Sequence, residues 1–267
     1  MKEIGIRAAT GAVYVGLTLL AALVGPLPTL ILFLPVCVIA ASELHNLLHF
    51  TPDTGRMRCM VIAGIAYSLI AGNSLAPFDL TGAVVAIGLL LLVFVSVAML
   101  LSRNPPDPGK ELGIDLLMIA LVAVPFALLT HLVAIDPHLM IGIMILLWTN
   151  ETGAYLTGKF FGKHKMIPSI SPKKTWEGLF GGIGFTVLFA WFLHMAWPLV
   201  GLEHWLAIAV IVAVLSTLGD LLESALKRAR GVKDAGDLLP GHGGILDRFD
   251  GLLLVAPGVW AYLLFVL

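Results

Sequence analysis

The chain has 267 residues, of which 59% are hydrophobic and only 12% are charged, with a formal net charge of -1. Soluble domains carry about 25% charged residues, so this composition excludes an ordinary soluble domain and indicates an integral membrane protein. The two cysteines, Cys37 and Cys59, are too few and too far apart for a disulfide framework or a cysteine metal site, and we interpret both as packing residues.

Nine apolar segments are each long enough to cross a hydrocarbon core, which takes about 20 residues of helix. They lie at residues 8–25, 27–47, 59–77, 80–102, 112–135, 138–158, 178–199, 204–226 and 249–267. The first follows two basic residues, as in a signal peptide, but no convincing cleavage site follows it, so we expect it to be retained. The sequence therefore predicts an all-α, polytopic membrane protein with about nine transmembrane helices. We divide it into four N-terminal helices at 1–110 and a C-terminal membrane region at 111–267 with two basic loops.

Basic residues are segregated in this arrangement. All sixteen lie on one side of the expected membrane: Lys2, Arg7, Arg56, Arg58, Arg103, Lys110, Lys159, Lys163, Lys165, Lys173, Lys174, Lys227, Arg228, Arg230, Lys233 and Arg248. The positive-inside rule then predicts a cytoplasmic N-terminus and an outside C-terminus. The long basic loops before the seventh and ninth segments would face the cytoplasm, where nucleotides are found.

Acidic residues lie inside the apolar segments, toward their cytoplasmic ends. Such residues are costly in a membrane and usually mark a site or a pathway. The acids concerned are Glu43, Asp115, Glu151, Asp220 and Asp250. In the eighth segment, Asp220, Glu223, Ser224 and Lys227 have the spacing i, i+3, i+4, i+7, which places them on one helix face. Asp247 and Asp250 repeat the i, i+3 spacing. Salt bridges that only hold helices together are an alternative explanation.

The loop GVKDAGDLLPGHGG, before the ninth segment, has the features of a phosphate site. Its glycines, including Gly243 and Gly244, allow backbone N–H groups to approach an anion. Positive charge comes from Lys227, Arg228, Lys233 and Arg248. Carboxylates together with substrate phosphates are the usual ligands of Mg²⁺, so Asp220, Asp247 and Asp250 are candidate metal ligands. His242 is either a turn residue or a hydrogen-bond donor to phosphate.

The other basic loop reads GKFFGKHKMIPSISPKKTWEGLFGG. Ser171, Lys173, Lys174 and Thr175 are candidate phosphate ligands, and Trp176 could lie at the membrane interface or stack on a base. The alternative is a juxtamembrane basic segment attracted to anionic lipid. A Walker A motif is absent from the sequence.

These residues together resemble the phosphatidate cytidylyltransferase (CDP-diacylglycerol synthase) family. The resemblance rests on Ser224-Ala-Leu-Lys227-Arg228, Lys233-Asp234, Pro240-Gly-His242-Gly243-Gly244 and Asp247-Arg248-Phe-Asp250, and on Gly153-Ala154-Tyr155 with Ser171-Pro-Lys173-Lys174-Thr175-Trp176-Glu177-Gly178. It is dense from about residue 148 to residue 251 and thins toward Glu43. Glu151 stands where the family more often has aspartate.

The resemblance implies an enzyme that makes CDP-diacylglycerol and pyrophosphate from CTP and phosphatidate. It implies Mg²⁺, with K⁺ sometimes sharing the site, a homodimer in the inner cell membrane, and no nucleic-acid partner. We expect Asp220, Asp247 and Asp250 to hold the metal, and Lys227 and Arg248 to bind phosphates. Ser224 would donate a hydrogen bond to a phosphate, and the turn at His242 would hold the pyrophosphate portion. Another lipid-linked CTP user, such as a polyprenol kinase or the archaeal ether-lipid cytidylyltransferase, is the nearer alternative, and a cation transporter is a more distant one.

Overall fold

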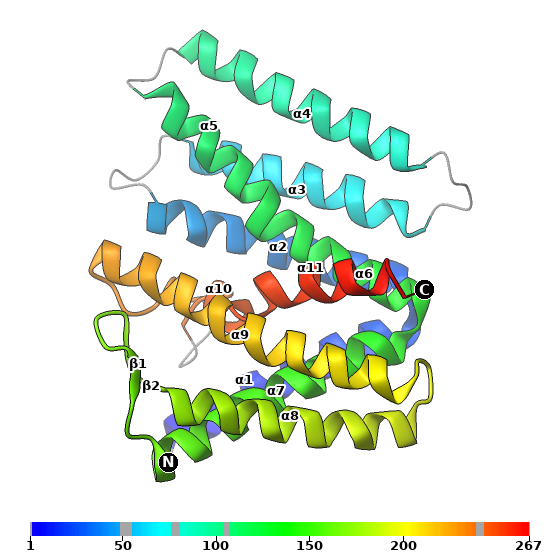
Figure 1. Cartoon of the computed structure of the whole chain (residues 1–267). Coiled ribbons are helices and arrows are strands. Elements are labelled where there is room, and N and C mark those ends of the chain that lie inside the picture. The colour runs from blue at the N-terminus through cyan, green and yellow to red at the C-terminus, as the bar shows by residue number, and fades with distance from the viewer. Residues whose placement is uncertain (1, 49–54, 76–80, 104–106, 239–242, 267) are drawn as a thin grey trace. The chain divides into compact units, whose positions relative to one another are not determined.

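The computed structural model describes residues 2–48, 55–75, 81–103, 107–238 and 243–266. Figure 1 shows its elements, nearly all of them helices. They are α1 (Lys2–Val24), α2 (Pro26–Leu48), α3 (Arg56–Asn73), α4 (Thr81–Arg103), α5 (Pro108–Leu117), the π-helix η1 (Met118–Ala123), α6 (Val124–Ile135), α7 (Pro137–Phe161), β1 (Lys165–Ile167), β2 (Ser171–Thr175), α8 (Trp176–Ala196), α9 (Leu202–Arg230), α10 (Leu246–Phe249) and α11 (Leu252–Leu263). Within these ranges each predicted apolar segment contains a helix, which confirms the all-α fold.

Several of these helices are suited to a membrane. Among the described residues, five helical stretches are long and apolar enough to cross one: α2, the continuous stretch Pro108–Ile135, α7, α8 and α9. Large apolar side chains such as Phe180 and Val210 are exposed on them, as expected of a surface that contacts lipid. The chain is therefore an integral membrane protein, while the count of nine spans stays a prediction.

The chain divides into two compact units. The first unit comprises Met1–Ala134 and Asp234–Arg248, and the second unit comprises Ile135–Lys233 and Phe249–Leu267. Each unit thus contains part of the predicted C-terminal region 111–267, to which the resemblance assigns catalysis. The predicted division at residue 110 is based on function rather than packing and stays a prediction.

A buried ion-pair network connects three helices of the first unit. Arg58 of α3 lies 2.6 Å from Glu111 Oε2 and 2.9 Å from Asp115 Oδ1, both on α5. Ser96 of α4 donates a hydrogen bond to Asp115, which is only 1% exposed. Charged side chains are almost never buried without such partners. One of the membrane acids, Asp115, therefore has a structural explanation.

In the second unit, the helix ends are defined by local sequence. Asp136 accepts a hydrogen bond from the N–H of His138 and precedes Pro137, a favourable first residue for α7. Thr175 caps α8 through the N–H of Gly178. Gly231 ends α9 in the left-handed conformation, with φ 72°. The helix α9 continues to Arg230 rather than to the predicted residue 226, and Lys227 lies on it, as its spacing from Asp220 predicts.

The basic loop between α7 and α8 contains an unpredicted antiparallel hairpin. Strand β1 pairs with β2, and Lys165 lies opposite Thr175 while Ile167 lies opposite Ser171. This pairing ends directly at the first residue of α8. The hairpin therefore fixes the positions of Ser171–Thr175, the segment predicted to bind phosphate.

Candidate active site

The polar face of α9 is the first part of the candidate site. Ser224 Oγ donates a 3.1 Å hydrogen bond to Asp220 Oδ1, and Lys227 Nζ donates a 2.5 Å hydrogen bond to Glu223 Oε2. Both contacts join residues i and i+4, as expected for side chains one turn apart on a helix. Glu223, Ser224 and Lys227 are buried, whereas Asp220 is partly exposed. Asp220 therefore presents its carboxylate at the accessible part of this face.

The hairpin contributes a lysine that forms an ion pair with Asp220. Lys174 Nζ lies 2.7 Å from Asp220 Oδ2 and 3.2 Å from the carbonyl oxygen of Thr217. Lys173, the preceding residue of β2, is exposed. Thr175, predicted to bind substrate, uses its hydroxyl oxygen as the cap of α8, and Ser171 is partly exposed at the start of β2. The hairpin and α9 thus combine positive and negative charge at one place in the second unit.

A second acid of the same unit lies close to Asp220. Asp250 occupies the turn between α10 and α11, outside the helices that qualify as membrane spans. The carboxylates of Asp220 and Glu151 are both near enough to Asp250 to interact with it electrostatically. Gly219 allows this approach, because a Cβ there would lie 3.1 Å from Gly251 Cα and closer still to the carbonyl oxygen of Asp250. Two acids this close need nearby positive charge if both are to be ionised.

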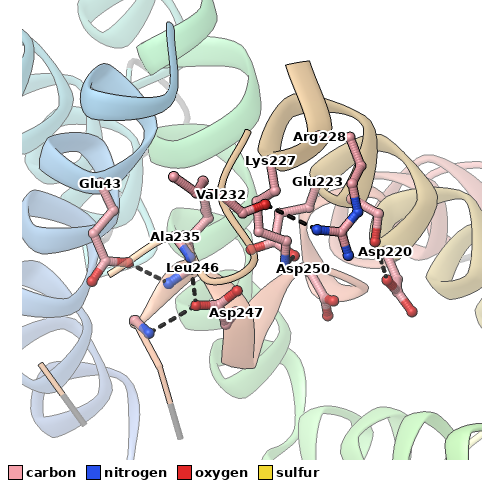
Figure 2. Close-up of polar contacts among 12 residues, drawn as sticks. Glu43, Asp220, Glu223, Lys227, Arg228, Val232, Ala235, Leu246, Asp247 and Asp250 are labelled. Carbon is pink, nitrogen blue, oxygen red and sulfur yellow. Dashed lines mark hydrogen bonds and ion pairs between the residues drawn. The ribbon is translucent and has the colours of Figure 1, made fainter. Parts of the chain in front are cut away.

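We name residues 234–244, the part of the loop GVKDAGDLLPGHGG that belongs to the first unit, the glycine loop, and its described ends are held by acids of the chain itself. Asp247 Oδ2 accepts hydrogen bonds of 2.8 Å from the N–H groups of Ala235 and Gly244. Glu43 accepts hydrogen bonds from Ile245 and Leu246, and Figure 2 shows these carboxylates beside the loop. The amide of Gly244, predicted to bind a substrate phosphate, thus donates to Asp247 in this structure. Its part in substrate binding stays a prediction.

The remaining predicted residues differ in their surroundings. Gly243 has φ 78°, a left-handed conformation that favours glycine. Lys233 and Arg228 are exposed, and Arg228 donates hydrogen bonds to the carbonyl oxygens of Ile170 and Val232. Arg248 lies on α10 and is partly exposed. His242 lies outside the described residues, so both interpretations of it stay open.

The donor atoms suit a hard cation, although the described residues contain no group of three or more His, Cys, Asp or Glu side chains arranged for a metal. Mg²⁺ usually takes one or two protein carboxylates and completes its ligands with water and substrate phosphate oxygens. Asp220 and Asp250 of the second unit fit that requirement. That Mg²⁺ binds here, and that Asp247 is one of its ligands, both stay predictions.

Two contacts could not have been found from the sequence. Lys174 and Asp220 are both predicted site residues, but no spacing rule relates positions in different loops and helices. Glu43 was noted as a membrane acid and in the resemblance, but without a partner, and the residues that donate to it follow it by 202 and 203 residues. The available signal was the cost of an acid within an apolar segment, which indicates a partner without identifying it.

Known proteins resemble this chain along most of its length. The sequence matches the cytidylyltransferase family over residues 5–266. The phosphatidate cytidylyltransferase of Staphylococcus epidermidis is 33% identical over 226 residues, covering 83% of this chain and 84% of that protein. The protein of that name from Mycobacterium tuberculosis is 37% identical over 205 residues, covering 70% of this chain and 61% of its own length. That from Staphylococcus aureus is 40% identical over 149 residues, covering 53% and 55%. The chain therefore belongs to the cytidylyltransferase family.

Proposed function

We propose that this chain is a phosphatidate cytidylyltransferase, which converts CTP and phosphatidate into CDP-diacylglycerol and pyrophosphate. The observation that carries the proposal is the 33% identity to an enzyme of that name over 84% of its length. The site supports it independently. Acids and lysines meet on α9 and the hairpin, and both substrates carry phosphate groups that need such charges for neutralisation.

The reaction is a nucleotidyl transfer. An oxygen of the phosphatidate phosphate attacks the α-phosphorus of CTP, and a new P–O bond forms in line with the α–β bond that breaks. The electron pair of the broken bond leaves with pyrophosphate. The second pKa of a phosphomonoester is about 6, so the attacking oxygen is already anionic at neutral pH. Positioning and charge neutralisation are therefore the main tasks of the protein.

The lysines of the second unit are suited to these tasks. Lys174 approaches Asp220 from the hairpin, and Lys227 lies two turns further along the same helix. Each can bind a phosphate oxygen by moving from its present carboxylate partner. Ser224, which donates to Asp220, orients that carboxylate. Lys173 and Arg228 are exposed and add positive charge at the edge of the site.

Mg²⁺ held by Asp220 and Asp250 would supply positive charge to the triphosphate. We also propose Asp247 as a metal ligand and Arg248 as a ligand of a nucleotide phosphate. We place this site at the cytoplasmic face, with the N-terminus cytoplasmic and the C-terminus outside, because all sixteen basic residues fall on one predicted side. We also propose a homodimer.

CTP labelled at different phosphorus atoms tests the function. The purified protein is mixed with phosphatidate in detergent micelles and with either [α-³²P]CTP or [γ-³²P]CTP. Cytidylyl transfer puts the α label into chloroform-soluble lipid and the γ label into pyrophosphate. A lipid kinase would instead put the γ label into lipid, and a transporter would put neither label there. Asp220→Asn should abolish transfer, while Glu203→Gln, a matched change at an acid whose side chain is 75% exposed, should retain it.

A further inference from the structure

Two carboxylates hold the described ends of the glycine loop. Ala235 at one end and Gly244 at the other both donate to Asp247 Oδ2. The next two amides are held by Glu43, with Ile245 donating to Oε1 at 3.0 Å and Leu246 to Oε2 at 2.7 Å. All these residues belong to the first unit. Asp247 closes the loop on itself, whereas Glu43 attaches it to α2.

The attachment occurs where α10 needs an acceptor. The first N–H groups of any helix have no partner within the helix, and α10 is only four residues long. A carboxylate is a favourable partner there, because its oxygens accept hydrogen bonds from these N–H groups. Glu43 does this from a different helix, and its side chain is buried, with only 6% of the residue exposed. A side chain of α2 therefore holds the start of α10.

The loop also lacks side chains at the two places where Glu43 approaches it. A Cβ at Gly236 would lie 2.5 Å from Glu43 Oε1, and a Cβ at Gly244 would lie 2.6 Å from Oε2. Neither glycine has a positive φ, so neither is required by backbone conformation. Both provide space for the carboxylate. Glu43 and these glycines thus form a fitted contact that we name the Glu43 anchor.

We propose that Glu43 is a positioning residue for nucleotidyl transfer, which fixes the base of the glycine loop and the start of α10. Asp247 and Arg248 directly follow the two anchored amides, so their positions are set by the anchor. This inference rests on the proposed function, in which both residues act on the nucleotide. A small displacement is enough to matter, because a shift of about 1 Å in a reacting geometry can cost about 100-fold in rate.

Glu43→Gln is the direct test. The amide side chain keeps the size of Glu43 but offers a single acceptor oxygen, so one of the two loop amides loses its partner. We expect hydrogen exchange in the peptides covering 243–248 to become about tenfold faster. We expect kcat to fall about tenfold or more, with KM for CTP and phosphatidate changed less than about threefold. The cooperative thermal unfolding of the membrane helices should stay unchanged, which a purely stabilising role for Glu43 does not predict.

The glycines give a second perturbation that leaves Glu43 in place. Gly236→Ala and Gly244→Ala should each displace the carboxylate and reproduce both the faster exchange and the lower kcat. Gly184→Ala is the matched control, because a Cβ at Gly184 meets no atom within 4 Å. Glu43→Asp keeps the charge but shortens the reach, and should fall between wild type and Glu43→Gln in both measurements.

The measurements separate failure of the anchor from failure of the proposed function. If hydrogen exchange at 243–248 is as slow in Glu43→Gln and in both glycine variants as in the wild type, the proposed role of the Glu43 anchor is overturned. Faster exchange with an unchanged kcat would also overturn it. If Glu43→Gln does not fold, the glycine variants decide in the same way. If wild-type protein makes no labelled lipid, the proposed function fails and the catalytic role fails with it, while exchange still shows whether Glu43 holds the loop.

Discussion

Gly219→Ala perturbs the meeting point of the two acids without changing either of them. A Cβ at this position would lie 3.1 Å from Gly251 Cα and 3.2 Å from the carbonyl carbon of Asp250. Carbon atoms pack at about 3.5–4.0 Å, and the carbonyl oxygen of Asp250 lies closer still, so these contacts require α9 and the Asp250 turn to separate by at least about 0.5 Å. The backbone must move, because neither contact is with a flexible side chain. Asp250 would then shift away from Asp220.

The expected loss is larger in rate than in stability. Overpacking costs about 1–3 kcal/mol, and alanine recovers about 1 kcal/mol over glycine within a helix, so the net cost is about 0–2 kcal/mol. A displacement of about 1 Å can lower a rate about 100-fold, so roughly half that shift should lower kcat by about 10-fold or more.

The assay is transfer of the α label of CTP to lipid, measured beside thermal unfolding in the same detergent. Gly184→Ala, also within a helix but with open space around it, controls for the change in helix propensity and should keep wild-type activity. Gly219→Ala with wild-type kcat would refute the reasoning, because the close approach of Asp250 to α9 would then be irrelevant to the chemistry.

Four further predictions follow from the same contacts. Chelation with EDTA should abolish transfer and added Mg²⁺ should restore it in wild type, whereas Asp220→Asn should stay inactive and show weaker binding of the divalent ion by calorimetry. Lys174→Gln should lower kcat about 100-fold, yet change the unfolding free energy by only about 0–1 kcal/mol, because its ion pair is partly exposed. Asp247→Asn keeps an acceptor oxygen for the loop amides, so activity should be lost while exchange in the loop stays slow; fast exchange would assign that residue to loop structure instead. Asp115→Ala should cost about 3–5 kcal/mol in thermal unfolding because it leaves Arg58 buried with less compensation, and replacing both residues by apolar ones should recover part of that cost.

The helices were predictable because the bilayer imposes a length. A segment needs about 20 apolar residues to cross, so composition alone located a helix in each predicted segment. The ends were less predictable, since they depend on local contacts. The helix α9 runs to Arg230 because Lys227 and Arg228 are good helix formers and Gly231 supplies the left-handed end. A boundary based on hydropathy falls earlier, at residue 226, because the charged residues Lys227 and Arg228 follow it.

The hairpin was missed for a different reason. Its strands are three and five residues long and contain several lysines, with neither the alternation nor the turn sequence that identifies strands. The pairing is supported by its surroundings, since Lys174 bonds to α9 and Thr175 caps α8. A short strand that is stabilised by contacts with helices is difficult to predict, because its own sequence need not have a strand pattern.

The site was predictable where it follows one helix and unpredictable where it joins distant segments. The 3.6-residue period placed Asp220 and Ser224 on one face, and they are hydrogen-bonded. No period relates Glu43 to Ile245. Only the fold brings α2 to the loop, and the sequence could indicate no more than that a membrane acid needs a partner.

The partner of each acid indicates what that acid can do. A carboxylate compensated by a lysine, as Asp220 is by Lys174, can exchange that partner, because the flexible ammonium can move to a phosphate while a cation replaces it. A carboxylate compensated by buried backbone amides, as Glu43 is, cannot exchange them without unfolding the segment that carries them. The first kind suits chemistry and the second suits positioning. Asp247 has the contacts of the second kind and the predicted role of the first, so removing its charge while keeping its acceptor is the change that distinguishes the two roles.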